Sequence, residues 1–106
     1  MASESSEPNA EPTGREGAAL GLAEDNLMWR EVEDEVIVLD KRTWNYMGIN
    51  GSGALLWKEI ARGATPAELV KCLCESYEID ERTASRDVDV FLVMLEGHDL
   101  LVRGEA

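Results

Sequence analysis

Residues 27–50 read LMWREVEDEVIVLDKRTWNYMGIN, a stretch with three β-rich runs and two short interruptions. The runs span residues 27–32, 35–40 and 44–50, and only Glu33-Asp34 and Lys41-Arg42-Thr43 separate them. Connections of two or three residues join antiparallel neighbours, because a parallel crossover needs a much longer segment. The stretch therefore predicts an antiparallel meander in which the first and third strands are the edges.

Three helical patterns follow this meander. The first lies between a capping Asn50 and Gly63, and the third begins at Asp80 and ends at a break at Gly97. The second starts with residues 65–68, Thr-Pro-Ala-Glu, a capping box with proline at the first helical position. Residues 100–102 are expected to pack back on the core. Three strands followed by three helices predict an α+β fold, winged-helix-like, with a three-stranded antiparallel sheet.

Residues 1–26 differ from the rest in composition. They hold six acidic residues, one basic residue and no aromatic residue. Such a segment buries too little apolar area to offset the entropy lost on ordering. The sequence predicts a disordered acidic tail over residues 1–26 and one folded domain over residues 27–103.

The charge balance excludes several classes of partner. The 106 residues carry 22 acidic and 10 basic side chains, a net charge of -12. This charge repels phosphate backbones and anionic lipid headgroups, so nucleic acid and membranes are not expected partners. No apolar run approaches the roughly 20 residues of a membrane span, and the N-terminus lacks the pattern of a signal peptide. We expect a cytoplasmic protein.

The chain offers no set of residues for catalysis or metal binding. Cys72 and Cys74 lie two apart on a predicted helix, so their side chains diverge by about 200° and cannot hold one metal ion. His98 is the only histidine, and near the end of a helix it favours a contact with the helix dipole. Gly51-Ser52-Gly53 lacks the lysine of a phosphate-binding loop. We expect no enzyme activity, no cofactor and no metal.

The third predicted strand is unusual for an edge. Residues 44–50 contain no charged side chain, whereas natural edge strands are protected by charge, proline or a covering element. The first strand has such protection from Arg30 and Glu31. The third strand is either covered by the acidic tail or used to recruit another strand, and its place at the end of the meander favours recruitment.

The third predicted helix carries two stripes. A projection at 100° per residue places five apolar residues on the expected core face: Ala84, Val88, Phe91, Leu92 and Leu95. A second stripe lies beside it, with Val93 further round: Thr83, Asp87, Val90, Met94 and His98. Either the other two helices bury both stripes, or the second stripe is the wall of a groove, for which methionine is well suited.

In order and spacing, the residues of the folded part resemble the PqqD-like family. These proteins are the RiPP recognition elements, which bind the leader segment of ribosomally synthesised precursor peptides. The resemblance covers about residues 30–102. It rests on Val38-Leu39-Asp40, Tyr46, Ile49-Asn50, Gly53-Ala54, Leu56-Trp57, Gly63, Glu68-Leu69, Leu73, Tyr77, Asp87-Val88, Phe91-Leu92 and Leu95.

The resemblance implies a cleft between the third strand and the third helix, into which the leader adds as an antiparallel strand. Residues 53–57, Gly-Ala-Leu-Leu-Trp, are most similar to the discrete leader-binding proteins of lasso peptide clusters, which deliver the precursor to a separate leader peptidase and cyclase. A peptide chaperone for a radical SAM enzyme, of the pyrroloquinoline quinone type, is the alternative. The chain departs from the family at Val90, Val93 and Met94, where polar residues are common, and at Asp99, where glycine is usual.

The sequence therefore predicts a non-enzymatic module that captures a leader peptide by strand addition. The expected binding residues come from the third strand and the third helix: Trp44, Asn45, Tyr46, Met47, Gly48, Thr83, Asp87, Val90 and Met94. A winged-helix DNA-binding regulator is the rival of another class, but residues 80–96 carry a net charge of -3 (two basic and five acidic residues), which opposes phosphate approach. A subunit that regulates an enzyme without touching the precursor is a third class.

Overall fold

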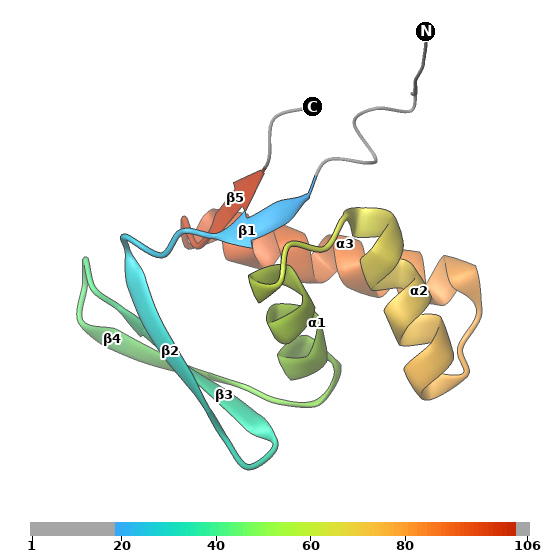
Figure 1. The fold of residues 1–106 in the computed structure, drawn as a ribbon, viewed down its shortest axis with the longest axis horizontal. Coiled ribbons are helices and arrows are strands. Elements are labelled where there is room, and N and C mark those ends of the chain that lie inside the picture. The colour runs from blue at the N-terminus through green and yellow to red at the C-terminus, as the bar shows by residue number, and fades with distance from the viewer. Residues whose placement is uncertain (1–18, 104–106) are drawn as a thin grey trace, which may run out of the picture.

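The computed structural model describes residues 19–103. Its elements are, in order, β1 (Leu20–Leu22), β2 (Leu27–Val32), β3 (Glu35–Asp40), β4 (Asn45–Ile49), α1 (Gly51–Ala61), α2 (Pro66–Tyr77), α3 (Glu81–Gly97) and β5 (Leu101–Arg103) (Figure 1). The predicted α+β fold, with a three-stranded antiparallel sheet followed by three helices, is confirmed.

The three-stranded sheet has the order β2-β3-β4, and both pairings are antiparallel. The meander is therefore confirmed, and β2 and β4 are its two edges. Val36, Val38 and Ile49 point to the same face of this sheet, and all three are buried. Because side chains alternate along a strand, the sheet has one face in the core and one face turned away from it.

The strand β4 begins one residue later than predicted. Trp44 lies in the turn before it with φ +62°, in the left-handed region, so it does not continue an extended strand. Its backbone N–H donates to the carbonyl oxygen of Asp40 at 2.6 Å, which closes the turn between β3 and β4.

The helix starts follow the predicted capping residues. Thr65 Oγ1 accepts from the backbone N–H of Glu68, and Glu68 Oε1 accepts from the N–H of Thr65, so both halves of the capping box are present. Asp80 Oδ1 accepts from the N–H of Thr83 at 2.8 Å. Hydrogen bonding with Thr83 lowers the pKa of Asp80. Asn50 precedes α1 as predicted, but its side chain makes no capping hydrogen bond.

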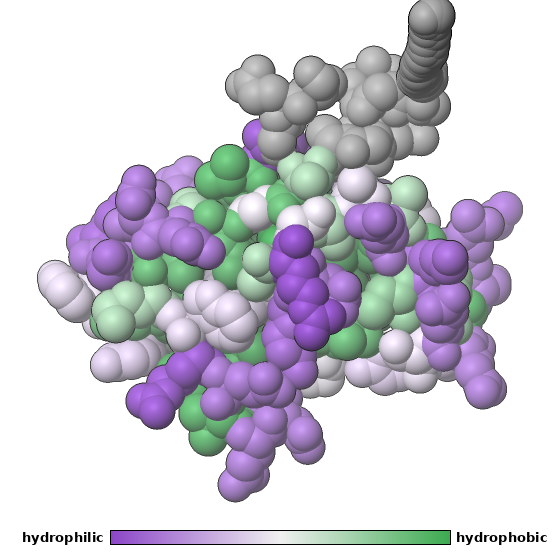
Figure 2. All heavy atoms as spheres, viewed as in Figure 1, coloured by the Kyte–Doolittle hydropathy of each residue, from purple (hydrophilic) through white to green (hydrophobic). Residues whose placement is uncertain are grey.

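The core lies between the sheet and the helices. All five residues of the predicted core stripe on α3 are buried. Trp57 of α1 is completely buried and meets Trp29 of β2 edge to face, with ring centroids 6.0 Å apart. On the outside, hydrophilic side chains cover most of the face in Figure 2, with apolar surface between them.

A second, two-stranded sheet joins the two ends of the described chain. The strands β1 and β5 pair antiparallel, and Leu20 and Leu22 of β1 are buried (Figure 1). The N–H of Leu20 also donates to the carbonyl of Ala64 at 2.8 Å. The expected boundary after residue 26 is therefore wrong for residues 19–26, the described part of the expected tail, because two buried leucines tie this segment to the core. The rest of the expected disordered tail, residues 1–18, lies outside the described residues.

Two further observations concern residues 19–103 alone. No helix there has the length and apolar character to cross a membrane. Cys72 and Cys74 are both free and half-buried, and burial raises the pKa of the Cys72 thiol.

Candidate functional site

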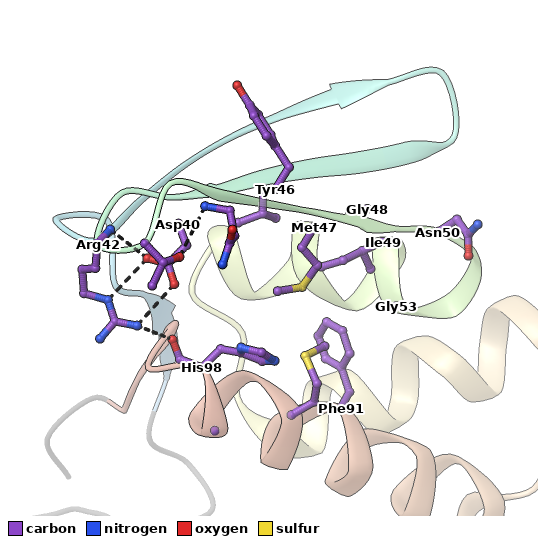
Figure 3. Close-up of a pocket in the computed structure, with 15 residues that line it drawn as sticks. Asp40, Arg42, Tyr46, Met47, Gly48, Ile49, Asn50, Gly53, Phe91 and His98 are labelled. Atoms are coloured by element: carbon purple, nitrogen blue, oxygen red, sulfur yellow. Dashed lines mark hydrogen bonds and ion pairs between the residues drawn. The ribbon is translucent and has the colours of Figure 1, made fainter.

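A cavity of about 750 Å³ lies between the edge strand β4 and the C-terminal half of α3 (Figure 3). We call it the β4–α3 groove. Within residues 19–103, β4 has a neighbouring strand only on the β3 side, and the groove runs along its other edge. Coverage of this edge by the acidic tail, the alternative offered by the sequence, concerns residues that lie largely outside the described ones. Its lining consists of Val38, Asp40, Arg42, Thr43, Asn45, Tyr46, Met47, Gly48, Ile49, Asn50, Gly53, Phe91, Met94, Gly97 and His98.

The middle of the groove is apolar. Met47 and Ile49 reach it from β4, and Phe91 and Met94 reach it from α3. Figure 3 shows Met47 and Phe91 pointing toward each other from the strand and the helix, while Tyr46 points away from the helices. Two flexible thioethers beside an aromatic ring form a surface that adapts to apolar side chains of different shape.

Gly53 supports this apolar region from behind, where α1 begins. A Cβ atom added there would lie 2.9 Å from Ile49 Cγ2 and 3.3 Å from Phe91 Cε1. Glycine therefore allows the first turn of α1 to approach two residues that line the groove.

We expect Gly53→Ala to displace Ile49 and Phe91 and to lower both stability and ligand affinity. Overpacking of this kind costs about 1–3 kcal/mol. Urea unfolding and peptide titration of the same variant measure the two effects. Gly21→Ala is a control for stability, since a Cβ at Gly21 meets nothing within 4 Å. Unchanged peptide affinity in Gly53→Ala would contradict the close packing of α1 behind the groove.

One end of the groove is polar, and there Arg42 connects the sheet to the end of α3. Arg42, in the β3–β4 turn, donates to Asp99 Oδ2 at 3.1 Å. Its guanidinium donates to the backbone carbonyl of His98 at 2.8 Å (Figure 3). It also bonds both carboxylate oxygens of Asp40 at 3.4 Å. These bonds connect the sheet to the C-terminus of α3, whose free carbonyls favour a cation.

The hydrogen bonds from Arg42 hold the pKa of Asp40 below its usual value. A lowered carboxyl pKa means that the favourable contact is present at neutral pH and is lost only as the pH falls through the acid range. The contact between Arg42 and Asp40 is therefore intact at neutral pH.

Asp99 explains one departure from the family pattern. Its φ is +57°, in the left-handed region that glycine adopts without a steric cost. Aspartate tolerates this region better than most residues. Here its side chain also accepts the hydrogen bond from Arg42.

Five of the nine predicted binding residues line the groove: Asn45, Tyr46, Met47, Gly48 and Met94. Trp44, Thr83, Asp87 and Val90 do not. Thr83 and Asp87 lie in the N-terminal half of α3, and Phe91 is the first residue of this helix to reach the cavity. The helical projection predicted the side of α3 but not how far along the helix the sheet lies.

The second stripe of α3 is only partly a groove wall. Val90 and Val93 are 64% and 66% exposed, so burial of both stripes by the other helices is wrong. Met94 is half-buried, and His98 lines the polar end. Phe91, assigned to the core by its spacing, is a core residue with its edge in the groove.

The sequence reasoning also missed Arg42, Gly53 and Gly97. Arg42 lies 57 positions before Asp99, and no local pattern connects the two. The one available signal was the place of residues 41–43 in the turn that leads into the uncharged strand.

An open sheet edge beside a helix, with an apolar groove between them, defines a class of small α+β modules suited to taking up an extended chain. The chain belongs to the PqqD family. The model of that family, described as Coenzyme PQQ synthesis protein D (PqqD), matches residues 35–101.

Two solved structures are similar to the chain. TbiB1 in complex with the TbiA(beta) leader peptide is 31% identical, with a TM-score of 0.73 over 81% of this chain and 98% of that one. Lasso peptide synthetase B1 complexed with the leader peptide is 22% identical, with a TM-score of 0.70 over 78% of this chain and 96% of that one, and this likeness concerns the fold. No curated protein matches the chain.

Proposed function

We propose that this protein binds the leader segment of a ribosomally synthesised precursor peptide by strand addition to β4, in lasso peptide biosynthesis. The observation that carries the proposal is the uncharged edge of β4, which no strand of residues 19–103 pairs with, beside the apolar β4–α3 groove. The likeness to TbiB1, described as a complex with a leader peptide, supports it.

Strand addition follows from the chemistry of the edge. Outward-facing N–H and C=O groups among residues 45–49 accept a further antiparallel strand, and each bond contributes about 0.5–1.5 kcal/mol. The bonds fix the register without reading side chains. Alternate side chains of the leader would face Met47, Phe91 and Met94, so specificity for apolar leader residues lies there.

The role is non-enzymatic and cytoplasmic: the module holds the leader while a separate leader peptidase, and a cyclase, act on the precursor. The binding residues proposed are Asn45 to Gly48 and Met94, joined by Phe91 and Ile49. Peptide delivery to a radical SAM enzyme is the second candidate, and the description of the matching family model favours it. Gene neighbourhood separates the two candidates.

Hydrogen exchange tests strand addition directly. A saturating leader peptide should slow exchange of the outward-facing amides among residues 45–49, because they gain bonding partners. The edge strand β2 is the internal control, since it lies on the far side of β3 and should change little. Tight binding with unchanged exchange across β4 would place the peptide elsewhere. No binding of any leader from the same gene cluster would overturn the function.

A further inference from the structure

Glycine at position 48 leaves a gap in β4 on the sheet face that points away from the helices. Gly48 lies directly opposite Ile37 of β3. Its neighbours Met47 and Ile49 face the β4–α3 groove, so a side chain at position 48 would project from the other face of the sheet. We call that surface the outer sheet face. Glycine weakens the interior of a strand and often marks a place where another group approaches closely.

The carboxylate of Glu35 occupies this gap. A Cβ atom added at Gly48 would lie 2.5 Å from Glu35 Oε2 and 3.4 Å from Glu35 Cδ. The side chain therefore extends from β3 across β4, and not toward Arg30, its diagonal neighbour on β2. Among residues 19–103, Glu35 forms no ion pair. A half-buried carboxylate without a cation thus lies beside the edge of β4 along which the groove runs.

A leader strand added to β4 would place one of its residues beside Gly48. The side chain of this leader residue projects from the outer sheet face, because directly paired residues share a face. Gly48 has no side chain to meet it, so the nearest groups are the Glu35 carboxylate and, diagonally, the ring of Tyr46. Tyr46 is 72% exposed and points away from the helices (Figure 3). A carboxylate and an aromatic ring both attract a cation.

We propose that Glu35 is a specificity-determining residue, which selects a lysine or arginine at the leader position beside Gly48. This inference rests on the proposed function, because that position exists only if the leader adds to β4. The β4–α3 groove selects apolar side chains from one face of the leader strand, and Glu35 selects a cation from the other. A leader shifted by one residue turns every side chain to the opposite face and loses both contacts.

Synthetic peptides test this selection. The probes are the leader encoded beside the gene for this chain and a series in which each residue of its bound segment is replaced in turn by lysine and by glutamate. Fluorescence polarisation measures their affinities for the full-length protein and for Glu35→Gln, which removes the charge and keeps the shape. Asp34→Asn is the matched control, because Asp34 is exposed in the β2–β3 turn and its replacement removes the same charge.

At one leader position we expect the unmodified protein to bind the lysine peptide about tenfold more tightly than the glutamate peptide. In Glu35→Gln this preference should fall to about twofold, the part due to the overall negative charge of the protein. Asp34→Asn should keep the full preference, and high salt should reduce it. Gly48→Ala is a second variant, because the added Cβ displaces the carboxylate while the charge stays in the protein. It should lower the preference at the same position.

A lysine preference that is equal in the unmodified protein and in Glu35→Gln at every position, with normal binding of the natural leader, would overturn this inference alone. The overall charge of the protein would then explain the preference. Failure of the unmodified protein to bind the natural leader would instead contradict the proposed function.

Discussion

Leu92→Asp is expected to unfold the protein, whereas Met94→Asp should leave it folded and unable to bind the leader. Leu92 is only 4% exposed, so its replacement puts an unpaired carboxylate among apolar side chains. The cost exceeds about 4 kcal/mol, most of the stability of a small domain. Met94 is half-buried on the wall of the β4–α3 groove, where a carboxylate keeps access to water but repels an apolar leader side chain.

We expect Met94→Asp to lose more than about thirtyfold in affinity, roughly 2 kcal/mol. Circular dichroism during thermal unfolding measures the fold, and fluorescence polarisation with a labelled leader measures binding. Val93→Asp is the matched control on the same helix, because Val93 is exposed and does not line the groove. Val93→Asp should have the same unfolding temperature as the unmodified protein and bind the leader with the same affinity. If Met94→Asp melts the domain, the proposed groove wall is part of the core.

Removal of residues 1–26 is the second change with a large expected effect. This truncation deletes β1, and with it two buried leucines and the pairing with β5. Burial of one leucine contributes about 1.5–3 kcal/mol, so the loss amounts to about 3–6 kcal/mol. We expect the midpoint of urea unfolding to fall sharply, or the shortened chain to be unfolded in water.

The control is a chain that starts at Ala19, which keeps Leu20, Leu22 and the hydrogen bond to Ala64. It should have the stability of the full chain and bind the leader equally well. Equal stability of the chains that start at Ala19 and at Leu27 would mean that the small sheet contributes nothing to folding.

The three-stranded meander and the helix starts were predictable because their signals are local. The turn Lys41-Arg42-Thr43 and the capping box at Thr65 each specify a structure within a few residues. The strand β1 has no such signal. It is three residues long, and its partner β5 lies about 80 positions later in the chain, so only the tertiary packing of Leu20 and Leu22 defines it.

The candidate site likewise has one part that a local sequence pattern predicts and one part that depends on long-range contacts. An uncharged edge strand is visible in a sequence, and residues 45–48 all line the groove. The helix contribution needed one further quantity, the position along α3 at which the sheet lies over the helix. That position depends on the tie from Arg42 to the end of α3 and on the close approach of Gly53 to Phe91, which are both long-range.

The small sheet of β1 and β5 also bears on how this domain can be used in larger proteins. Leu20 and Arg103 are direct partners in it, so the chain enters and leaves the described domain at neighbouring points (Figure 1). Domains whose ends lie close together tolerate insertion and end-to-end fusion, since a host chain can continue past them with little rearrangement. Neither end residue lines the β4–α3 groove. The described domain can therefore be fused to an enzyme at either end, or inserted into a loop of that enzyme, without covering the β4–α3 groove.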